Sequence, residues 1–191
     1  MSSSLKTKVD EDVEEYEKGI ETALDWFKEN EENNYVDQSS TIALFKELSL
    51  AYGDYLLFKK EANELNKEAL GRIEEGELDI DQTLFLLAVK RALVLKLDAE
   101  DHDYLFQSLA QNGISITRDS FTATLEQLPP LKTTQRVMQA MIDTAGGFPI
   151  SKSNFKELLV LSGFVDQKVK ALDSILNKKN RSKARKRSKK S

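Results

Sequence analysis

Two long heptad patterns of apolar residues constrain the fold of this chain most strongly. Within residues 9–27 and again within residues 44–69, apolar residues recur at alternating intervals of four and three. Such spacing places apolar side chains along one stripe of a helix that packs against another helix. The sequence therefore predicts two long helices joined by the polar, asparagine-rich residues 29–40. The two stripes consist of Val9, Val13, Tyr16, Ile20, Ala23 and Phe27, and of Leu44, Leu48, Ala51, Tyr55, Phe58, Ala62, Leu65 and Ala69.

These stripes fit either a coiled-coil dimer or a helical hairpin within one chain. Both contain Ala, Tyr and Phe, where a coiled-coil dimer prefers Leu, Ile and Val. The second segment also has apolar residues off its stripe, such as Phe45 and Leu56, which need burial on more than one side. This favours a hairpin formed by residues 1–74, in a monomer or a partner-bound subunit, and Gly53 and Gly71 mark positions where its second helix can bend or end.

A short pattern recurs three times in the second half of the chain. Each copy has a Gly, an Ile three or four residues later, a polar residue directly after the Ile, and a Phe five residues after the Ile. The Gly ends one helix, the Ile docks the link, the polar residue N-caps the next helix, and the Phe enters the core. The copies contain Ile80, Asp81 and Phe85; Ile116, Thr117 and Phe121; and Ile150, Ser151 and Phe155.

The intervals between the three Ile positions are 36 and 34 residues, which is typical of a repeated helix–turn–helix unit. We expect these units to form one globular body from residues 75–178, packed on the hairpin. Their second helices are expected at residues 99–111 after Asp98, at 132–144 and at 166–178, and only the Ile positions suggest strands. The predicted fold class is all-α, a bundle of about eight helices.

Residues 76–178 resemble the exit-helix and linker portions of a calmodulin-like EF-hand chain, where Gly, a short apolar position and a helix-starting Phe recur at a similar interval. A calcium loop needs oxygen ligands at alternate positions, then Gly, then a bidentate Glu at the twelfth position. Residues 110–115 and 144–149 supply almost none of these ligands and are too short. No calcium-binding residue is therefore assigned on the basis of this resemblance.

Charge is divided sharply along the chain. Residues 1–176 hold all 32 acidic residues and 19 of the 28 basic ones, for a formal charge near −13. Residues 177–191 hold nine basic residues and no acidic one. We expect residues 179–191 to form a disordered, flexible basic tail. The nine cations are Lys178, Lys179, Arg181, Lys183, Arg185, Lys186, Arg187, Lys189 and Lys190.

A basic run of this density indicates an import signal, a sequence-independent contact with nucleic acid, or a solubilising extension. The first two interpretations are compatible with each other. The expected location is the nucleus or nucleolus in a eukaryotic cell, and the cytoplasm otherwise.

The first predicted helix carries a dense acidic face that includes Glu14 and Glu15. Solvation of these charges is the simplest interpretation. The alternative is a surface that binds a basic partner, or this protein's own tail. Trp26 lies beside the apolar stripe, where it either packs at the edge of the core or anchors a partner. Trp26, Glu14 and Glu15 are therefore the candidate protein-partner surface.

The single histidine, His102, lies among Asp98, Asp101 and Asp103. One imidazole beside several carboxylates is a conceivable site for a divalent ion. The simpler interpretation is that Asp98 N-caps a helix whose first turn is acidic. Cysteine is absent, and no nucleophile elbow or phosphate loop occurs. We therefore predict no catalytic, cofactor or metal residue, and no membrane span, because the longest apolar-rich run, 84–97, is too short.

Together these features predict a non-enzymatic helical interaction or adaptor protein. Its acidic body would bind protein partners, and its basic tail would direct it to the nucleus or tether it to nucleic acid. Two alternatives remain open: a metal-dependent enzyme that uses the acidic cluster around His102, and a prokaryotic or phage DNA-packaging or nucleoid factor.

Overall fold

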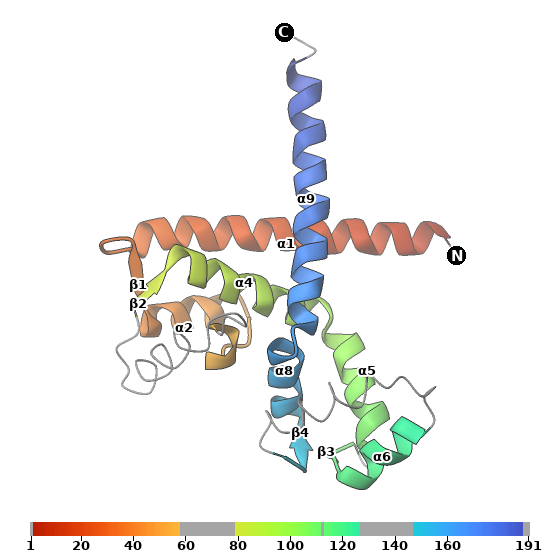
Figure 1. Ribbon diagram of the computed structural model, residues 1–191. Helices are drawn as coiled ribbons and strands as arrows, with labels where there is room; N and C mark the ends of the chain where they lie inside the picture. Colours follow the sequence, from red (N-terminus) through yellow and green to blue (C-terminus); the bar gives the residue numbers. More distant parts are fainter. Residues whose placement is uncertain (1, 58–78, 112, 127–146, 189–191) are drawn as a thin grey trace.

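The structure, a computed structural model, describes residues 2–57, 79–111, 113–126 and 147–188, and helices dominate these residues. This confirms the predicted all-α bundle. Figure 1 shows the long helices α1 and α9 crossing above the other elements. In chain order the elements are α1 (Ser2–Asn30), β1 (Tyr35–Asp37), α2 (Gln38–Glu47), the 3-10 helix η1 (Asp54–Leu57), β2 (Asp79–Asp81), α4 (Gln82–Leu97), α5 (Ala99–Ala110), β3 (Ser115–Ile116), α6 (Arg118–Glu126), β4 (Ile150–Ser151), α8 (Lys152–Leu161) and α9 (Phe164–Ser188).

Helix α4 lies at the centre of the core. It contacts α1, α9, α5 and η1, and its buried residues lie all round the helix rather than along one stripe. A helix that is apolar on every side is stable only when neighbours cover every side. The run 84–97, too short to cross a membrane, is therefore the element on which the bundle is assembled. Its buried apolar residues are Phe85, Ala88, Val89, Ala92, Leu93, Val94 and Leu95.

The first heptad stripe is largely buried as predicted, but among the described residues α1 packs mainly on α4 and α9 rather than on the segment that begins at Leu44. Val13, Tyr16 and Phe27 are buried, whereas Val9 is 48% exposed beyond the packed part of α1. Gly19 explains the close approach of α1 to α4: a Cβ built there would lie 2.6 Å from a methyl carbon of Leu93. A larger residue at this position would have to displace the Leu93 side chain.

The prediction that the second half of the hairpin is one continuous helix is wrong. Helix α2 ends at Glu47, because Ser49 takes a positive φ of 54° and the amide of Leu50 donates to the carbonyl of Phe45 at 2.7 Å. This left-handed residue closes the helix before Ala51, which is exposed. The rest of the stripe, Phe58 to Ala69, lies outside the described residues.

The predicted loop of residues 29–40 is also shorter than expected. Helix α1 continues to Asn30, and Asn33 and Asn34 turn the chain with φ angles of 54° and 68°. Asparagine tolerates this left-handed conformation better than most residues. Strand β1 and helix α2 follow directly, so the connection is a tight turn into a strand.

Two short antiparallel strand pairs join the repeated units. Val36 pairs with Ile80 between β1 and β2, and Ile116 pairs with Ile150 between β3 and β4. All four side chains are buried, which confirms the docking role predicted for the three Ile positions. The repeat also has a fourth copy that sequence analysis missed, because Val36 replaces Ile and Thr41 stands where the others have Phe.

The predicted N-caps follow these strands. The side chain of Asp81 accepts from the amide of Leu84 at 2.7 Å, and the missed fourth copy is capped by Asp37 in the same way. Thr117 accepts from the amide of Ser120 at 3.1 Å, and Ser151 accepts from the amide of Asn154 at 3.2 Å. Each cap satisfies an amide that has no partner within the helix.

Removing either of the last two caps is expected to destabilise the protein to a similar extent. Thr117→Ala and Ser151→Ala should each lower the free energy of unfolding by about 0.5 to 2 kcal/mol. Urea unfolding measures this, with Ser153→Ala, an exposed position inside α8, as the control. A loss at only one of the two caps would show that the two repeat units are not equivalent.

Candidate functional site

The basic C-terminal segment continues helix α9 as far as Ser188. The helix runs from Phe164 through Ser188 and contains seven of the nine cations, while Lys189 and Lys190 lie outside the described residues. Residues 164–188 contain no Gly or Pro, and Lys, Arg and Ala are strong helix formers. Cations near a helix C-terminus also interact favourably with the macrodipole.

The first half of α9 is anchored in the core. Val165, Val169 and Leu172 are buried, in a part of the helix that contacts α4 and α8. Arg91 of α4 is 2% exposed, and its guanidinium donates twice to the carboxylate of Asp166, at 2.7 and 2.8 Å. A third donor of Arg91 reaches the carbonyl of Leu56 at 2.7 Å. This bidentate pair holds the start of α9 against α4 and η1.

A second polar anchor lies where α9 crosses α1. The Tyr16 hydroxyl donates to Asp173 at 3.1 Å, and the Lys90 ammonium donates to the other carboxylate oxygen at 2.8 Å. Burial raises the pKa of Tyr16 strongly, and the Asp173 charge adds to this effect, so the phenol stays a donor. Asp173 thus ties α1, α4 and α9 together and sets the direction in which α9 leaves the body.

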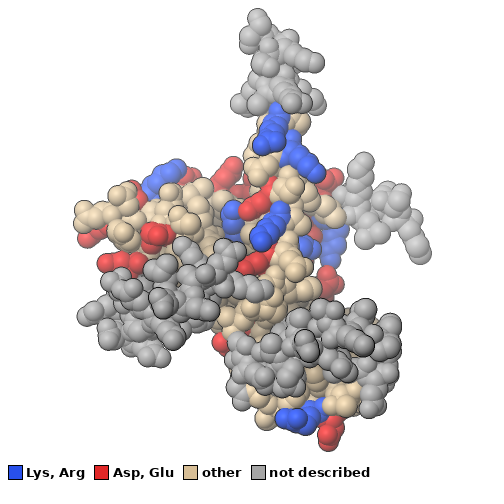
Figure 2. Space-filling model, viewed as in Figure 1, with Lys and Arg blue, Asp and Glu red and all other residues tan. Residues whose placement is uncertain are grey.

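Beyond this crossing, α9 projects away from the rest of the protein (Figure 1). Lys178 and Arg181 are exposed there, and neither forms an ion pair with any described residue. Figure 2 shows Lys and Arg side chains gathered along the described part of α9. The seven cations of the basic segment that lie in the helix are Lys178, Lys179, Arg181, Lys183, Arg185, Lys186 and Arg187.

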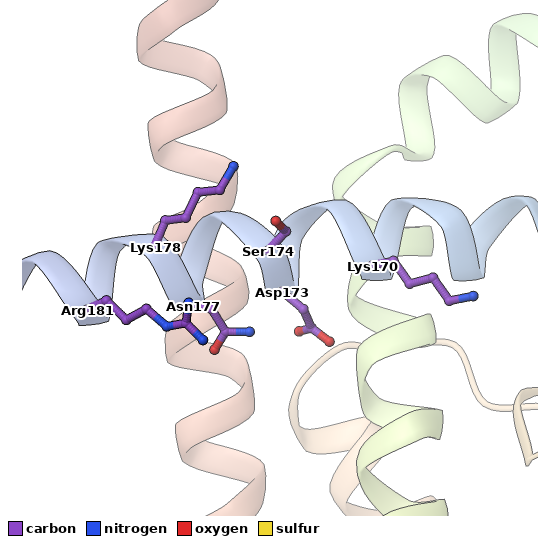
Figure 3. Close-up of a pocket in the computed structure, with 6 residues that line it drawn as sticks. All are labelled: Lys170, Asp173, Ser174, Asn177, Lys178 and Arg181. Carbon is purple, nitrogen blue, oxygen red and sulfur yellow. The ribbon is translucent and has the colours of Figure 1, made fainter.

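A shallow groove of about 390 Å³ runs along this part of α9. Figure 3 shows Arg181 and Asn177 pointing to the same side of the helix, with Lys178 on the other side. Among the described residues of the lining the only acidic one is Asp173, which is already engaged by Tyr16 and Lys90. The groove therefore offers cationic and neutral donors, as phosphate oxygens require. Its lining consists of Lys170, Asp173, Ser174, Asn177, Lys178 and Arg181.

The basic run alone did not indicate that Lys170, Ser174 and Asn177 belong to this site. Their spacing of four and three, continued by Arg181 four residues later, places them on one side of a helix. That signal is present in the sequence, but it is useful only once the basic segment is known to be helical.

One tail cation contacts the acidic helix. The Lys179 ammonium donates to Glu17 at 3.0 Å, and this hydrogen bond, with the nearby charges of Glu14 and Asp10, raises the pKa of Lys179. The acidic face of α1 therefore meets this protein's own basic segment, one of the alternatives considered from the sequence. Lys179 faces the body, while Lys178 and Arg181 face solvent.

The three residues of the candidate partner surface on α1 differ in exposure. Trp26 is half-buried and stacks on Phe85 with ring centroids 5.8 Å apart, so it packs at the edge of the core. Glu14 and Glu15 are exposed, and Glu15 pairs with Lys96 at 3.3 Å. The acidic residues remain a candidate surface, whereas Trp26 packs against the core of its own chain.

Two of the acidic residues near His102 are engaged in ion pairs. Asp98 pairs with Lys168 at 3.2 Å and Asp103 pairs with Lys152 at 2.8 Å. Asp98 lies at the predicted N-cap position of α5, but its side chain makes no capping hydrogen bond and pairs with Lys168 instead. Within the described ranges, no group of three or more His, Asp or Glu side chains is arranged to hold a metal ion.

Comparisons with protein-family models, curated proteins and solved structures found no match to this chain. Among the residues that the structure describes, no helix is both long and apolar enough to cross a membrane. The interpretation of the site therefore depends on its geometry and charge.

Proposed function

We propose that this protein is a non-enzymatic helical adaptor that is tethered to nucleic acid through the basic half of α9. The observation that carries the proposal is the anchored, projecting helix: Asp166 and Asp173 hold its first half, while Lys178 and Arg181 extend into solvent. An acidic body repels phosphate, so a basic element contacts nucleic acid best when it projects from that body. Residues 178–188 extend for about 15 Å as a helix.

The helical form supports a contact that is independent of nucleotide sequence. Lys and Arg bind phosphate oxygens, which carry no base information, and the major groove of duplex DNA is wide enough to admit an α-helix. Counterion release would supply most of the affinity. The body, with its exposed Glu14 and Glu15, stays available for a protein partner of positive charge.

Nuclear or nucleolar targeting is a second candidate function of the same segment. It is supported by the density of nine Lys and Arg within residues 177–191, which is typical of import signals. The two functions are compatible because an imported protein can use the same cations once it reaches nucleic acid.

Single substitutions in the groove test the tether. Lys178→Gln and Arg181→Gln should each weaken binding to unrelated duplexes equally, and each should reduce the slope of log affinity against log salt by about 1. Fluorescence anisotropy with short labelled DNA and RNA duplexes measures both quantities. Lys28→Gln, an exposed lysine on α1, is the control and should change neither. Slopes that stay unchanged in both groove variants would rule out phosphate contacts at these positions.

A further inference from the structure

A separate pocket of about 430 Å³ lies between α5 and α9, beside the N-terminal part of α9 and away from its basic half. Its wall combines polar and apolar groups from the two helices. The residues that line it include Asp98, Asp101, His102, Leu105, Phe164 and Lys168. Neither the adaptor function nor the nucleic-acid tether uses any of them.

His102 is the unusual member of this wall. His102 is only 3% exposed, and neither of its ring nitrogens has a hydrogen-bond partner among the described residues. Burial lowers the pKa of His102, so the ring is neutral and offers one donor and one acceptor. Buried polar atoms in proteins are nearly always paired, so an unpaired imidazole beside a cavity indicates a missing partner.

The charges around the pocket select the kind of partner. Lys168 is paired with Asp98 at 3.2 Å, whereas Asp101 is exposed and pairs with no described cation. The charge of Lys156 in α8 also acts on the imidazole, so the Asp101 carboxylate is the acceptor that the lining leaves for a cationic ligand.

The apolar part of the rim adds a second requirement. Leu105 is 41% exposed and Phe164 is 49% exposed, and both border the pocket. The Phe164 ring lies edge-on to His102 with centroids 6.3 Å apart. A ligand body that covers these two side chains would bury apolar surface and exclude water from the imidazole.

We propose that this pocket binds an ammonium group carried on an apolar body. The apolar body packs on Leu105 and Phe164, and the ammonium donates to the Asp101 carboxylate and to the unprotonated nitrogen of His102. The ligand is either a free amphipathic amine or the lysine side chain of a partner segment, since both present this chemistry.

Nuclear magnetic resonance of the full chain tests the site directly, because His102 is the only histidine and its ring nitrogens give a single set of signals. Phenethylammonium and a capped Phe-Lys dipeptide amide are the two probes, and phenylpropanoate is the anionic control of similar shape. We expect saturable shifts of the imidazole nitrogens with at least one of the two amines and none with the anion. Binding of the dipeptide alone would identify the lysine of a partner as the source.

Asp101→Asn, which keeps the shape of the side chain, should weaken amine binding about tenfold or more, since it removes a charged acceptor. Asp119→Asn, at an exposed position on α6, should leave binding unchanged. Equal binding of the anion, no saturable shift with either amine, or full affinity in Asp101→Asn would overturn the proposal.

Discussion

Replacing Arg91 with alanine is expected to lower the free energy of unfolding by about 3 to 5 kcal/mol. The guanidinium is almost fully buried, with three hydrogen bonds of 2.7 to 2.8 Å to Asp166 and to the carbonyl of Leu56. The substitution leaves a carboxylate and a carbonyl without these donors and opens a cavity beside α4. The Asp166 side chain is 22% exposed, so water can compensate part of the loss and the effect should fall towards the lower limit.

Urea unfolding measures this loss, and an exposed ion pair provides the matched control. Lys28 and Asp25 are 3.4 Å apart on the surface of α1, with side chains 63% and 74% exposed. Lys28→Ala should therefore cost less than about 1 kcal/mol. If Arg91→Ala cost no more than Lys28→Ala, the buried pair would not be what anchors α9.

The apolar periodicities predicted much of this fold because each periodicity reflects a local physical requirement. The stripe through Val13, Tyr16 and Phe27 needs a helical partner, and all three side chains are buried. The recurrent Ile followed by a capping residue needs a docking surface and a helix start, and Ile116 with Thr117 provides both. Such requirements are met within a few residues, so they are visible without the tertiary structure.

The sequence did not indicate in the same way which elements pack against each other. The α1 stripe fits any apolar helix face, and its packing on α4 depends on the match between Gly19 and Leu93, which lie far apart in the sequence. The end of α2 depends on one left-handed residue, Ser49, whose conformation the heptad pattern does not indicate. Periodicity therefore showed which faces are buried but not which faces meet.

The candidate site could be predicted only in part, for the same reason. The cations Lys178 and Arg181 were evident from composition, since no acidic residue interrupts them. Their presentation on an anchored helix was not, because Asp173 appears in the sequence as an ordinary surface acid. Its contacts with Tyr16 and Lys90 form only when three helices meet.

Removing the basic segment is expected to have the largest effect on function. A chain that ends at Leu176 keeps both anchors of α9, Asp166 and Asp173, and should remain folded. It should nevertheless lose nucleic-acid affinity by a factor of about 10³ or more, because it loses nine cations and leaves a body of net negative charge. A full-length variant with all nine cations changed to glutamine separates loss of charge from loss of helix and should bind equally weakly.

The most direct measurement of the tether is the salt dependence of nucleic-acid binding by the full chain and by these two variants. For the full chain, we expect the affinity to fall by about 10³-fold or more between about 50 and 200 mM salt, as for proteins that contact at least six phosphates. Both variants should show weak binding with a slope near zero. Binding by the truncated chain that is as tight and as salt-dependent as that of the full chain would contradict the account.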